Sequence, residues 1–255
     1  MEIMTLGSGS SGNCTIIKSK GHIIMVDAGV PKKALLEKLL AVNVNLEDIE
    51  AAFFTHDHID HIRSVDLVPI EKRYAGLGTV DLLGAAHFMT PYNEFQIAGF
   101  KITPIPLSHD AVNALGYIIE DDEEKLVYLT DTGYVNRNIF KYLKNADRYL
   151  FESNYDVEML MNSNRPYFLI QRIFGDKGHL SNEQAGMYLA KLIGDKTKEI
   201  MLIHLSADTN TPEIALKTVN KCLKEKCIDI NKIKLHYANR YDISKGGMVD
   251  DEVKI

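Results

Sequence analysis

The sequence of 255 residues has few cysteines, no long apolar run and no excess of basic charge. The three cysteines, Cys14, Cys222 and Cys227, form neither a disulfide framework nor a paired zinc motif. No apolar run approaches the roughly 18 residues that span a bilayer, and the first residues lack the pattern of a signal peptide. We therefore expect a cytoplasmic protein with reduced thiols and no membrane contact.

The charge balance limits the partners of the chain. With 29 basic and 35 acidic residues the formal net charge is −6, whereas a surface that binds nucleic acid throughout needs clustered Lys and Arg. A local basic groove is compatible with this balance. The hydrophobic content of 45% and the charged content of 25% are those of an ordinary globular protein and argue against disorder. Because repeats and linkers are absent, the simplest organisation is one domain over residues 1–255.

Short apolar and β-branched segments, separated by turn residues, predict many strands. The predicted strands are residues 2–6, 14–18, 22–27, 51–55, 100–107, 115–120, 125–130, 148–152, 199–205 and 233–237. The pair 115–120 and 125–130 is predicted to form a hairpin around an acidic turn.

Three helices have recognisable start signals. Pro31 opens the first, whose leucines are expected to form one apolar stripe. These leucines are Leu35, Leu36, Leu39 and Leu40. Ser181 and Gln184 form a capping box for a helix that ends near residue 192. Thr211, followed by Pro212, starts the third.

Three other segments have weaker signals. A helical stretch is expected at about residues 62–74. Residues 154–177 show no clean period and are rich in Asn, Arg and aromatic residues, so we expect a surface excursion with room for substrate contacts. The polar tail from Ser244 is expected to be loose.

The most informative stretch follows the predicted strand at residues 51–55. Three histidines and two aspartates fall within six residues there, namely His56, Asp57, His58, Asp60 and His61. In extended backbone His56 and His58 point to the same side and can reach one metal ion. Where the chain turns into a helix, Asp60 and His61 can reach a second ion. Nitrogen and carboxylate ligands suit Zn²⁺, Mn²⁺ or Fe²⁺ rather than Ca²⁺.

Further candidate ligands follow other predicted strands. His109 follows the strand 100–107, Asp131 follows the strand 125–130, and His204 follows the apolar residues 200–203. Taken singly, such histidines are more often hydrogen-bonded loop residues, but the repeated order of strand and ligand favours a shared metal site. His22, His87 and His236 lack this context, and we expect them to be structural or surface residues.

The pattern His56-x-His58-x-Asp60-His61, followed by a lone His, a lone Asp and a final His, resembles the metallo-β-lactamase superfamily. Five further segments resemble its YycJ (WalJ) branch. They are Gly7-Ser8-Gly9-Ser10-Ser11-Gly12-Asn13, Thr130-Asp131-Thr132-Gly133-Tyr134, Phe151-Glu152-Ser153-Asn154, Gly178-His179-Leu180-Ser181-Asn182-Glu183 and His204-Leu205-Ser206. Tyr155 departs from the branch, which often has His at that position.

The resemblance implies an α/β fold, a four-layer αβ/βα sandwich, with two divalent ions in a cleft at one edge of the sheets. By this resemblance, His56, His58 and His109 hold one ion, Asp60, His61 and His204 hold the other, and Asp131 bridges both. Zn²⁺ or Mn²⁺ is expected, with Fe as a further possibility. The ions would bind a bridging hydroxide that acts as the nucleophile and would also hold a phosphoryl oxygen.

A second set of residues is similar in layout to ribonuclease Z. There a His at the start of a helix gives a proton to the leaving oxygen, helped by a Glu at a strand end, and the matching residues are His179 and Glu152. Together with Asp60 they form the implied catalytic set. A His supplies such a proton well near neutral pH. The alternatives are a helix cap for His179 and a surface carboxylate for Glu152.

Substrate contacts are expected on two segments. The glycine-serine turn lacks the Gly-Lys-Ser/Thr of a nucleotide P-loop, so it is either a tight hairpin or a cleft wall in which Ser10, Ser11 and Asn13 bind phosphate. Asn154 is a further candidate for substrate binding. In the excursion, three cations form either a basic rim or an ordinary solvated surface. They are Arg165, Arg172 and Lys177.

The leading expectation is a dinuclear-metal phosphodiesterase acting on nucleic acid, most simply an exonuclease. Alternatives are a small-molecule phosphodiesterase similar to the PhnP proteins, a hydrolase of acyl bonds such as lactones or thioesters, and a metal-binding module without activity. The missing export signal argues against a periplasmic β-lactamase, and the missing C-terminal helical domain argues against a glyoxalase-type thioesterase. The length leaves no room for the inserted domain of β-CASP ribonucleases.

Overall fold

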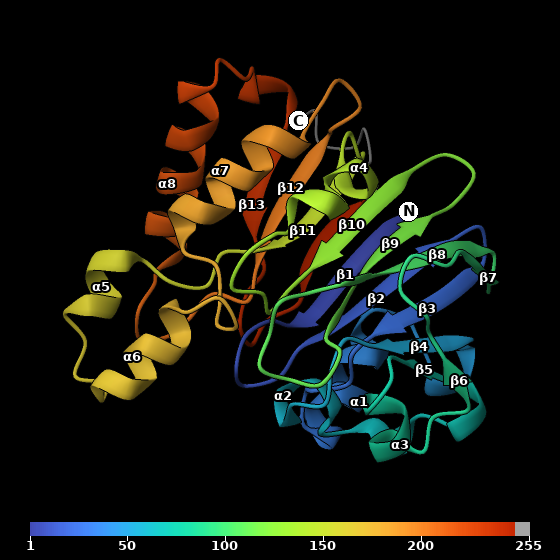
Figure 1. The fold of residues 1–255 in the computed structure, drawn as a ribbon. Coiled ribbons are helices and arrows are strands. Elements are labelled where there is room, and N and C mark those ends of the chain that lie inside the picture. The colour runs from blue at the N-terminus through green and yellow to red at the C-terminus, as the bar shows by residue number, and fades with distance from the viewer. Residues whose placement is uncertain (248–255) are drawn as a thin grey trace.

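The computed structural model describes residues 1–247 and contains two seven-stranded sheets packed face to face (Figure 1). The first sheet has the order β14-β1-β2-β3-β4-β5-β6. Its strands are β1 (Glu2–Gly7), β2 (Cys14–Ser19), β3 (His22–Val26), β4 (Ala51–Phe54), β5 (Arg73–Ala75), β6 (His87–Phe88) and β14 (Ser244–Gly247).

The second sheet has the order β13-β12-β11-β10-β9-β8-β7. Its strands are β7 (Phe95–Ile97), β8 (Phe100–Pro106), β9 (Leu115–Glu120), β10 (Lys125–Leu129), β11 (Arg148–Glu152), β12 (Glu199–Ile203) and β13 (Lys234–Tyr237). The helices are α1 (Lys32–Ala41), α2 (Ile59–Ile62), α3 (Thr79–Leu83), α4 (Phe140–Leu143), α5 (Val157–Met161), α6 (Tyr167–Phe174), α7 (Asn182–Leu192) and α8 (Pro212–Glu225). No helix of the described residues is both long and apolar enough to cross a membrane.

Because side chains point alternately to the two faces of a sheet, the buried apolar side chains form three layers. In β11, Leu150 points between the sheets and packs in one cluster with Phe53 of the first sheet. Its neighbours Tyr149 and Phe151 point to the opposite face, where they join Leu189 of α7. The outer face of the first sheet packs against α1 in a third cluster. The layer order is helix, sheet, sheet, helix, which confirms the predicted four-layer sandwich.

Parallel pairing directs several strand ends to one edge. β3, β4 and β5 run parallel in the first sheet, and β10, β11, β12 and β13 run parallel in the second. The carboxyl ends of parallel strands are the usual position of ligand sites in α/β proteins. The chain continues from these ends into the histidines and carboxylates singled out above.

Two predicted elements differ from the structure in the first half of the chain. The helix expected at 62–74 is wrong: α2 ends at Ile62, two 3₁₀ turns follow, and Arg73 already begins β5. Val68 is extended because Pro69 follows it, which interrupts a helix. The leucine stripe of α1 is only half correct. Leu35 and Leu39 are buried, whereas Leu36 and Leu40 are 41% and 64% exposed.

The expected loose tail is also wrong over its first four residues. Ser244–Gly247 form β14, which pairs antiparallel with β1. The remainder of the tail, residues 248–255, lies outside the described residues.

The excursion after β11 contains α5 and α6, which lie to one side of the sheets (Figure 1). The two helices bury a small core of their own, formed by Tyr155, Leu160, Ile170 and Ile173. The ends of the excursion are tied together, since Asn154 N donates to Leu180 O and Asn182 N donates to Tyr155 O, both at 2.9 Å. The excursion is therefore a compact unit closed at its base.

Candidate metal centre

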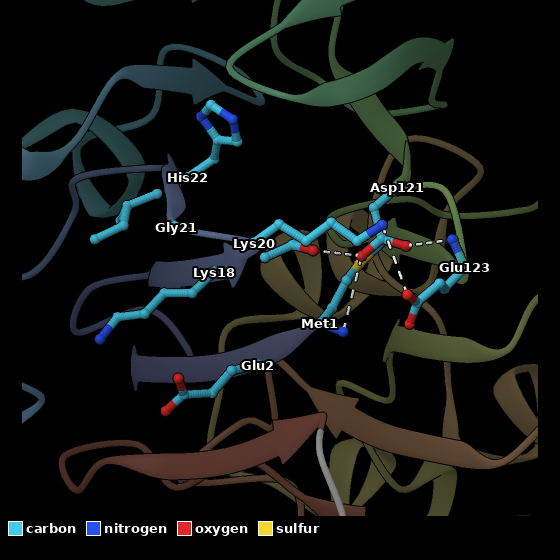
Figure 2. A pocket seen from close by; sticks show the side chains of 10 residues that line it. Met1, Glu2, Lys18, Lys20, Gly21, His22, Asp121 and Glu123 are labelled. Atoms are coloured by element: carbon cyan, nitrogen blue, oxygen red, sulfur yellow. Dashed lines mark hydrogen bonds and ion pairs between the residues drawn. The ribbon is translucent and has the colours of Figure 1, made fainter.

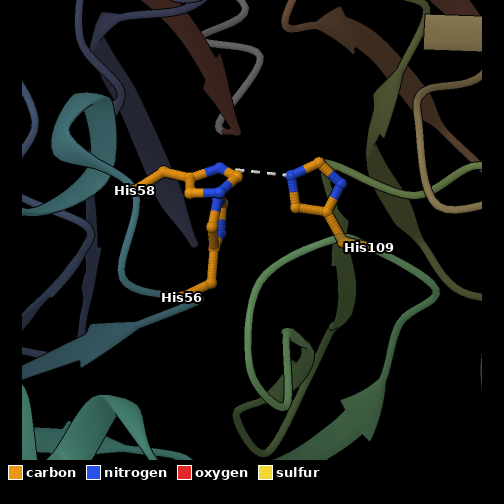
Figure 3. Close-up of side chains that lie close together, drawn as sticks. All are labelled: His56, His58 and His109. Carbon is orange, nitrogen blue, oxygen red and sulfur yellow. Dashed lines mark hydrogen bonds between the residues drawn. The ribbon is translucent and has the colours of Figure 1, made fainter. Parts of the chain in front are cut away.

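The predicted ligands meet where the strands end. His56, His58 and His109 form one group whose ligand atoms lie within 4.8 Å of one another (Figure 3). Asp60, His61 and His204 form a second group by the same measure. The structure thus brings together two triplets from three separate chain segments.

Asp131 lies between the two groups. Its Oδ2 is 3.2 Å from His61 Nε2, and its Oδ1 is 3.8 Å from His109 Nε2 and 3.3 Å from His204 Nδ1. The carboxylate is buried, being 2% exposed. One carboxylate therefore faces both triplets.

Hydrogen bonds fix the orientation of three of the rings. Nδ1 of His61 bonds Asp27 Oδ2 at 2.7 Å, Nδ1 of His109 bonds Gly178 O at 3.2 Å, and Nδ1 of His204 bonds Glu152 Oε1 at 3.0 Å. Because Nδ1 donates its hydrogen to an oxygen in each case, the lone pair of Nε2 can bind a metal ion.

Two of the candidate ligands have an unpartnered ring nitrogen within residues 1–247. Among the described residues, the buried Nε2 atoms of His56 and His204 have no hydrogen-bond partner. Buried polar atoms are almost always satisfied in folded proteins, and a divalent metal ion would satisfy both. The residues present therefore fit divalent metal ions.

The pKa values of the histidines fall into two groups. Although burial opposes it, Asp27 raises the pKa of His61 well above its usual value and Asp131 raises that of His204 to about 10, so these two rings release a proton when a metal ion binds. Burial and the neighbouring histidines lower the pKa of His56 well below its usual value, and burial also lowers the pKa of His109. Both imidazoles are therefore neutral, the form that binds metals. Although burial opposes it, the positive charge of His204 and His61 holds the pKa of Asp131 well below its usual value.

His179 and Glu152 form a pair beside this centre. Glu152 Oε1 accepts a hydrogen bond from His179 Nδ1 at 2.8 Å, and its Oε2 accepts from the backbone N–H groups of Thr132 and Leu180. Glu152 is fully buried, so it is not a surface carboxylate. Although burial opposes ionisation, the His179 and His204 rings lower the pKa of Glu152 to about 2. The cap of α7 is Ser181 rather than His179.

A family model described as a β-lactamase superfamily domain matches residues 22–205. The chain belongs to the metallo-β-lactamase superfamily. It is 36% identical over 228 residues to a Streptococcus pneumoniae protein named exodeoxyribonuclease WalJ, which covers 84% of this chain and 85% of that protein. It is 33% identical over 238 residues to exodeoxyribonuclease YycJ of Bacillus anthracis, with coverage of 89% and 90%. These relatives confirm the predicted resemblance to the YycJ (WalJ) branch.

Structural similarity supports the same fold. The metallo-β-lactamase fold protein YhfI from Bacillus subtilis aligns with a TM-score of 0.72 at 17% identity, covering 96% of this chain and 99% of that chain. At this identity the likeness concerns the fold alone.

The metallo-β-lactamase cleft is a cavity of about 200 Å³ beside the candidate ligands. Ser10 and Asn154 line it, as do Arg165 and Arg172 of the excursion. Each arginine is paired with a carboxylate: Arg165 with Asp208 at 2.9 Å, and Arg172 with Asp110 at 2.5 Å. The positive charge of this rim is therefore largely neutralised.

Three of the predicted substrate contacts lie elsewhere. Ser11 and Lys177 are not among the residues that line the cleft. Asn13 does not line it either, and its Nδ2 lies 3.0 Å from His61 Nε2 and 3.4 Å from Asp60 Oδ2. Asn13 thus contacts candidate ligands rather than the open space of the cleft.

Sequence reasoning missed Asp27 and Thr55. Asp27 Oδ1 accepts from the backbone N–H of Thr55 at 2.8 Å while Oδ2 bonds His61, and Thr55 Oγ1 is 3.0 Å from His56 Nδ1. Asp27 follows strand β3, which is the same signal that identified the other candidates. From the sequence alone, however, it belongs to the predicted strand 22–27 and not to the residues after it.

Three residues of the centre share an uncommon backbone conformation. Asp27, Asp131 and His204 have φ angles of 59°, 53° and 59°, in the left-handed region that favours glycine. Strained backbone of this kind concentrates at functional sites.

A different cavity, of about 390 Å³, lies between the β2–β3 turn and the β9–β10 turn (Figure 2). Several of its charged groups have polar partners. Asp121 accepts from Ser19 Oγ at 2.6 Å and lies 3.8 Å from the amino group of Met1, and Lys20 pairs with Glu123 at 3.6 Å. None of the ligand groups found among residues 1–247 lies there. This cavity therefore shows no feature of a metal site.

Proposed function

We propose that this protein is a metal-dependent phosphodiesterase that degrades DNA from strand ends. Two divalent ions, Zn²⁺ or Mn²⁺ with Fe as a further possibility, occupy the centre. His56, His58 and His109 hold one ion, and a second triplet holds the other. The second triplet is Asp60, His61 and His204, and Asp131, which faces both triplets, would hold both ions.

The observation that carries the proposal is found in His56 and His204. Their Nδ1 atoms are bonded to oxygen, while their buried Nε2 atoms have no partner among the described residues. Such rings are prepared for metal ions before any ion arrives. When bound, two such ions activate water and neutralise charge that develops on a phosphoryl group.

The remaining residues act on the substrate. Glu152 accepts a hydrogen bond from Nδ1 of His179, and in the doubly protonated ring Nε2–H then gives its proton to the leaving oxygen. A phosphodiester of DNA leaves as a poor alkoxide and needs this proton. Ser10 and Asn154 in the cleft wall position the phosphate. Asp60 contributes to catalysis as a ligand.

The names of the two bacterial relatives support DNA as the substrate and an exonuclease as the activity. We further propose that the protein acts in the cytoplasm, where its three cysteines stay reduced.

The proposal is tested by offering four substrate classes side by side to protein loaded with Mn²⁺ or Zn²⁺. They are end-labelled DNA in single- and double-stranded form, labelled RNA, bis-p-nitrophenyl phosphate and an acyl lactone. The expected result is stepwise release of nucleotides from DNA together with hydrolysis of the nitrophenyl ester. Hydrolysis of the lactone alone, or no metal in protein purified without chelator and no activity after metal is added, would contradict it.

A further inference from the structure

A groove outside the metal cleft combines aromatic and basic side chains. It consists of two adjoining cavities of about 210 and 400 Å³ that share Tyr134 and Asn136. Ser108 lines the smaller cavity, and Arg137, Tyr188 and Lys191 line the larger one. We call this surface the Tyr134 groove.

The groove begins next to the metal centre. Ser108 directly precedes His109, and Tyr134 follows Asp131 by three residues, a reach of at most about 11 Å. Thr132 joins the two segments, since its Oγ1 accepts from Ser108 N at 3.1 Å and donates to Tyr134 O at 2.8 Å. The distance corresponds to on the order of three phosphate spacings along one DNA strand.

The cations of the groove differ from those of the cleft rim. Arg137 and Lys191 are exposed, and neither has a carboxylate within 4.0 Å among residues 1–247. Arg165 and Arg172 of the rim are both paired with aspartates. In a chain of net charge −6, two free cations on one groove attract a polyanion there.

The aromatic residues add a second kind of contact. Tyr134 is 37% exposed at the junction of the two cavities. Tyr188 packs edge-on against Phe140, with ring centroids 6.1 Å apart, and the Lys191 ammonium lies 5.9 Å from the Tyr188 ring. Aromatic faces beside a cationic track are how proteins bind single strands, because bases stack on the rings.

We propose that the Tyr134 groove binds one single DNA strand that extends out of the metal centre. Arg137 and Lys191 contact its phosphates, and a base stacks on Tyr134. This inference rests on the proposed function and adds to it, because a small phosphodiester that fills the cleft does not extend to Lys191.

The test compares the double variant Arg137→Gln/Lys191→Gln with the wild-type protein, both loaded with Mn²⁺. We measure kcat/KM for a labelled single-stranded oligodeoxynucleotide and for bis-p-nitrophenyl phosphate over a range of salt concentrations. Each lost phosphate contact on a single strand reduces the slope of log affinity against log salt by about 0.7. We expect the magnitude of the slope of log kcat/KM against log salt to fall by about 1.4 for DNA and to stay unchanged for the nitrophenyl ester.

A matched control is Lys217→Gln/Lys224→Gln on α8, which lies on the other side of α7 from α4 (Figure 1). This variant removes the same charge and should keep the wild-type slope. Tyr134→Ala should lower kcat/KM for DNA about tenfold, while Tyr134→Phe retains it.

Three results would overturn the inference. The first is an Arg137/Lys191 variant that retains the wild-type salt dependence of kcat/KM for DNA. The second is an equal loss of activity on both substrates, and the third is the same loss of salt dependence in the control variant. A wild-type protein that hydrolyses the nitrophenyl ester but not DNA would instead refute the proposed function itself.

Discussion

Strands β11 and β12 each begin in one buried charged cluster and end in another. At their starts, Arg148 donates to Glu199 at 2.5 Å and to Glu124 at 3.0 Å, and Glu199 also accepts from His236 and from the backbone N–H of Gly247. At their ends lies the candidate metal centre. The first cluster satisfies its own charges, whereas the second leaves buried imidazole nitrogens without partners among the described residues.

This difference separates a structural cluster from a functional one. Both clusters are buried, both are rich in titratable groups and both shift pKa values, so perturbed titration alone does not distinguish them. What distinguishes them is whether the protein completes the hydrogen bonding by itself.

Asp131→Ala should remove the metal ions and abolish hydrolysis of both DNA and bis-p-nitrophenyl phosphate. The reason is that this carboxylate faces both ligand triplets and offsets the repulsion between two cations. Elemental analysis and rate measurements check the outcome. Asp57→Ala, in the same sequence motif but in none of the ligand groups, should keep metal and activity. Wild-type metal content and rate in Asp131→Ala would contradict the bridging assignment.

His179→Ala should keep its metal ions yet lose about 10²–10⁴-fold in kcat on DNA, the range of a general acid. The loss should be much smaller on bis-p-nitrophenyl phosphate, whose leaving group departs without a proton. His204→Ala is the contrasting variant and should lose metal. Equal losses of His179→Ala on the two substrates would mean that the ring binds phosphate or supports the fold.

Asp27→Asn should weaken metal binding by about 10–100-fold, as replacement of a carboxylate behind a histidine ligand usually does. The amide can donate a hydrogen bond to His61 Nδ1. This favours the tautomer with its proton on Nε2, the atom that would otherwise bind the metal ion. Competition with a chelator measures the affinity. The control is Glu50→Gln, which alters an exposed His–carboxylate pair with His22 and should leave metal binding unchanged. An unchanged affinity in Asp27→Asn would refute this positioning role.

Glu199→Gln should affect stability rather than catalysis. Although burial opposes ionisation, His236, Gly247 N–H and Arg148 lower the pKa of Glu199 to about 2 from its ordinary value of 4.5. Its stabilisation, on the order of 3 kcal/mol, is therefore present above pH 4.5 and disappears as the pH falls towards 2. Urea unfolding of both proteins from pH 7 to pH 2 checks this, and a difference that stays constant with pH would contradict it.

The sequence predicted the candidate ligands because each carries a local signal, a polar side chain directly after an apolar strand. Thr55 has no such signal, and the function of Asp27 depends on the pairing of β3 with β4, which brings it beside His61. The Tyr134 groove was also hidden, since Ser108, Tyr134 and Lys191 come from three distant segments.

The two wrong secondary-structure predictions have the same origin. Residues 62–74 have apolar positions compatible with a helix, but pairing with β4 draws Arg73–Ala75 into a strand. Ser244–Gly247 have low strand propensity, yet their backbone pairs with the edge of β1. Pro69 is a local signal against a helix over 62–74, but the pairing that places each segment in a sheet is long-range and cannot be read from the local sequence.

The closed base of the excursion between Glu152 and His179 has a consequence for changes in α5 and α6. Because the backbone bonds at Asn154, Tyr155, Leu180 and Asn182 tie its two ends together, we expect that the length and composition of these helices can change while Glu152 and His179 keep their positions. Lengthening a loop whose ends are already fixed costs little free energy. We therefore expect that α5 and α6 can be replaced while the contact between Glu152 and His179 is retained.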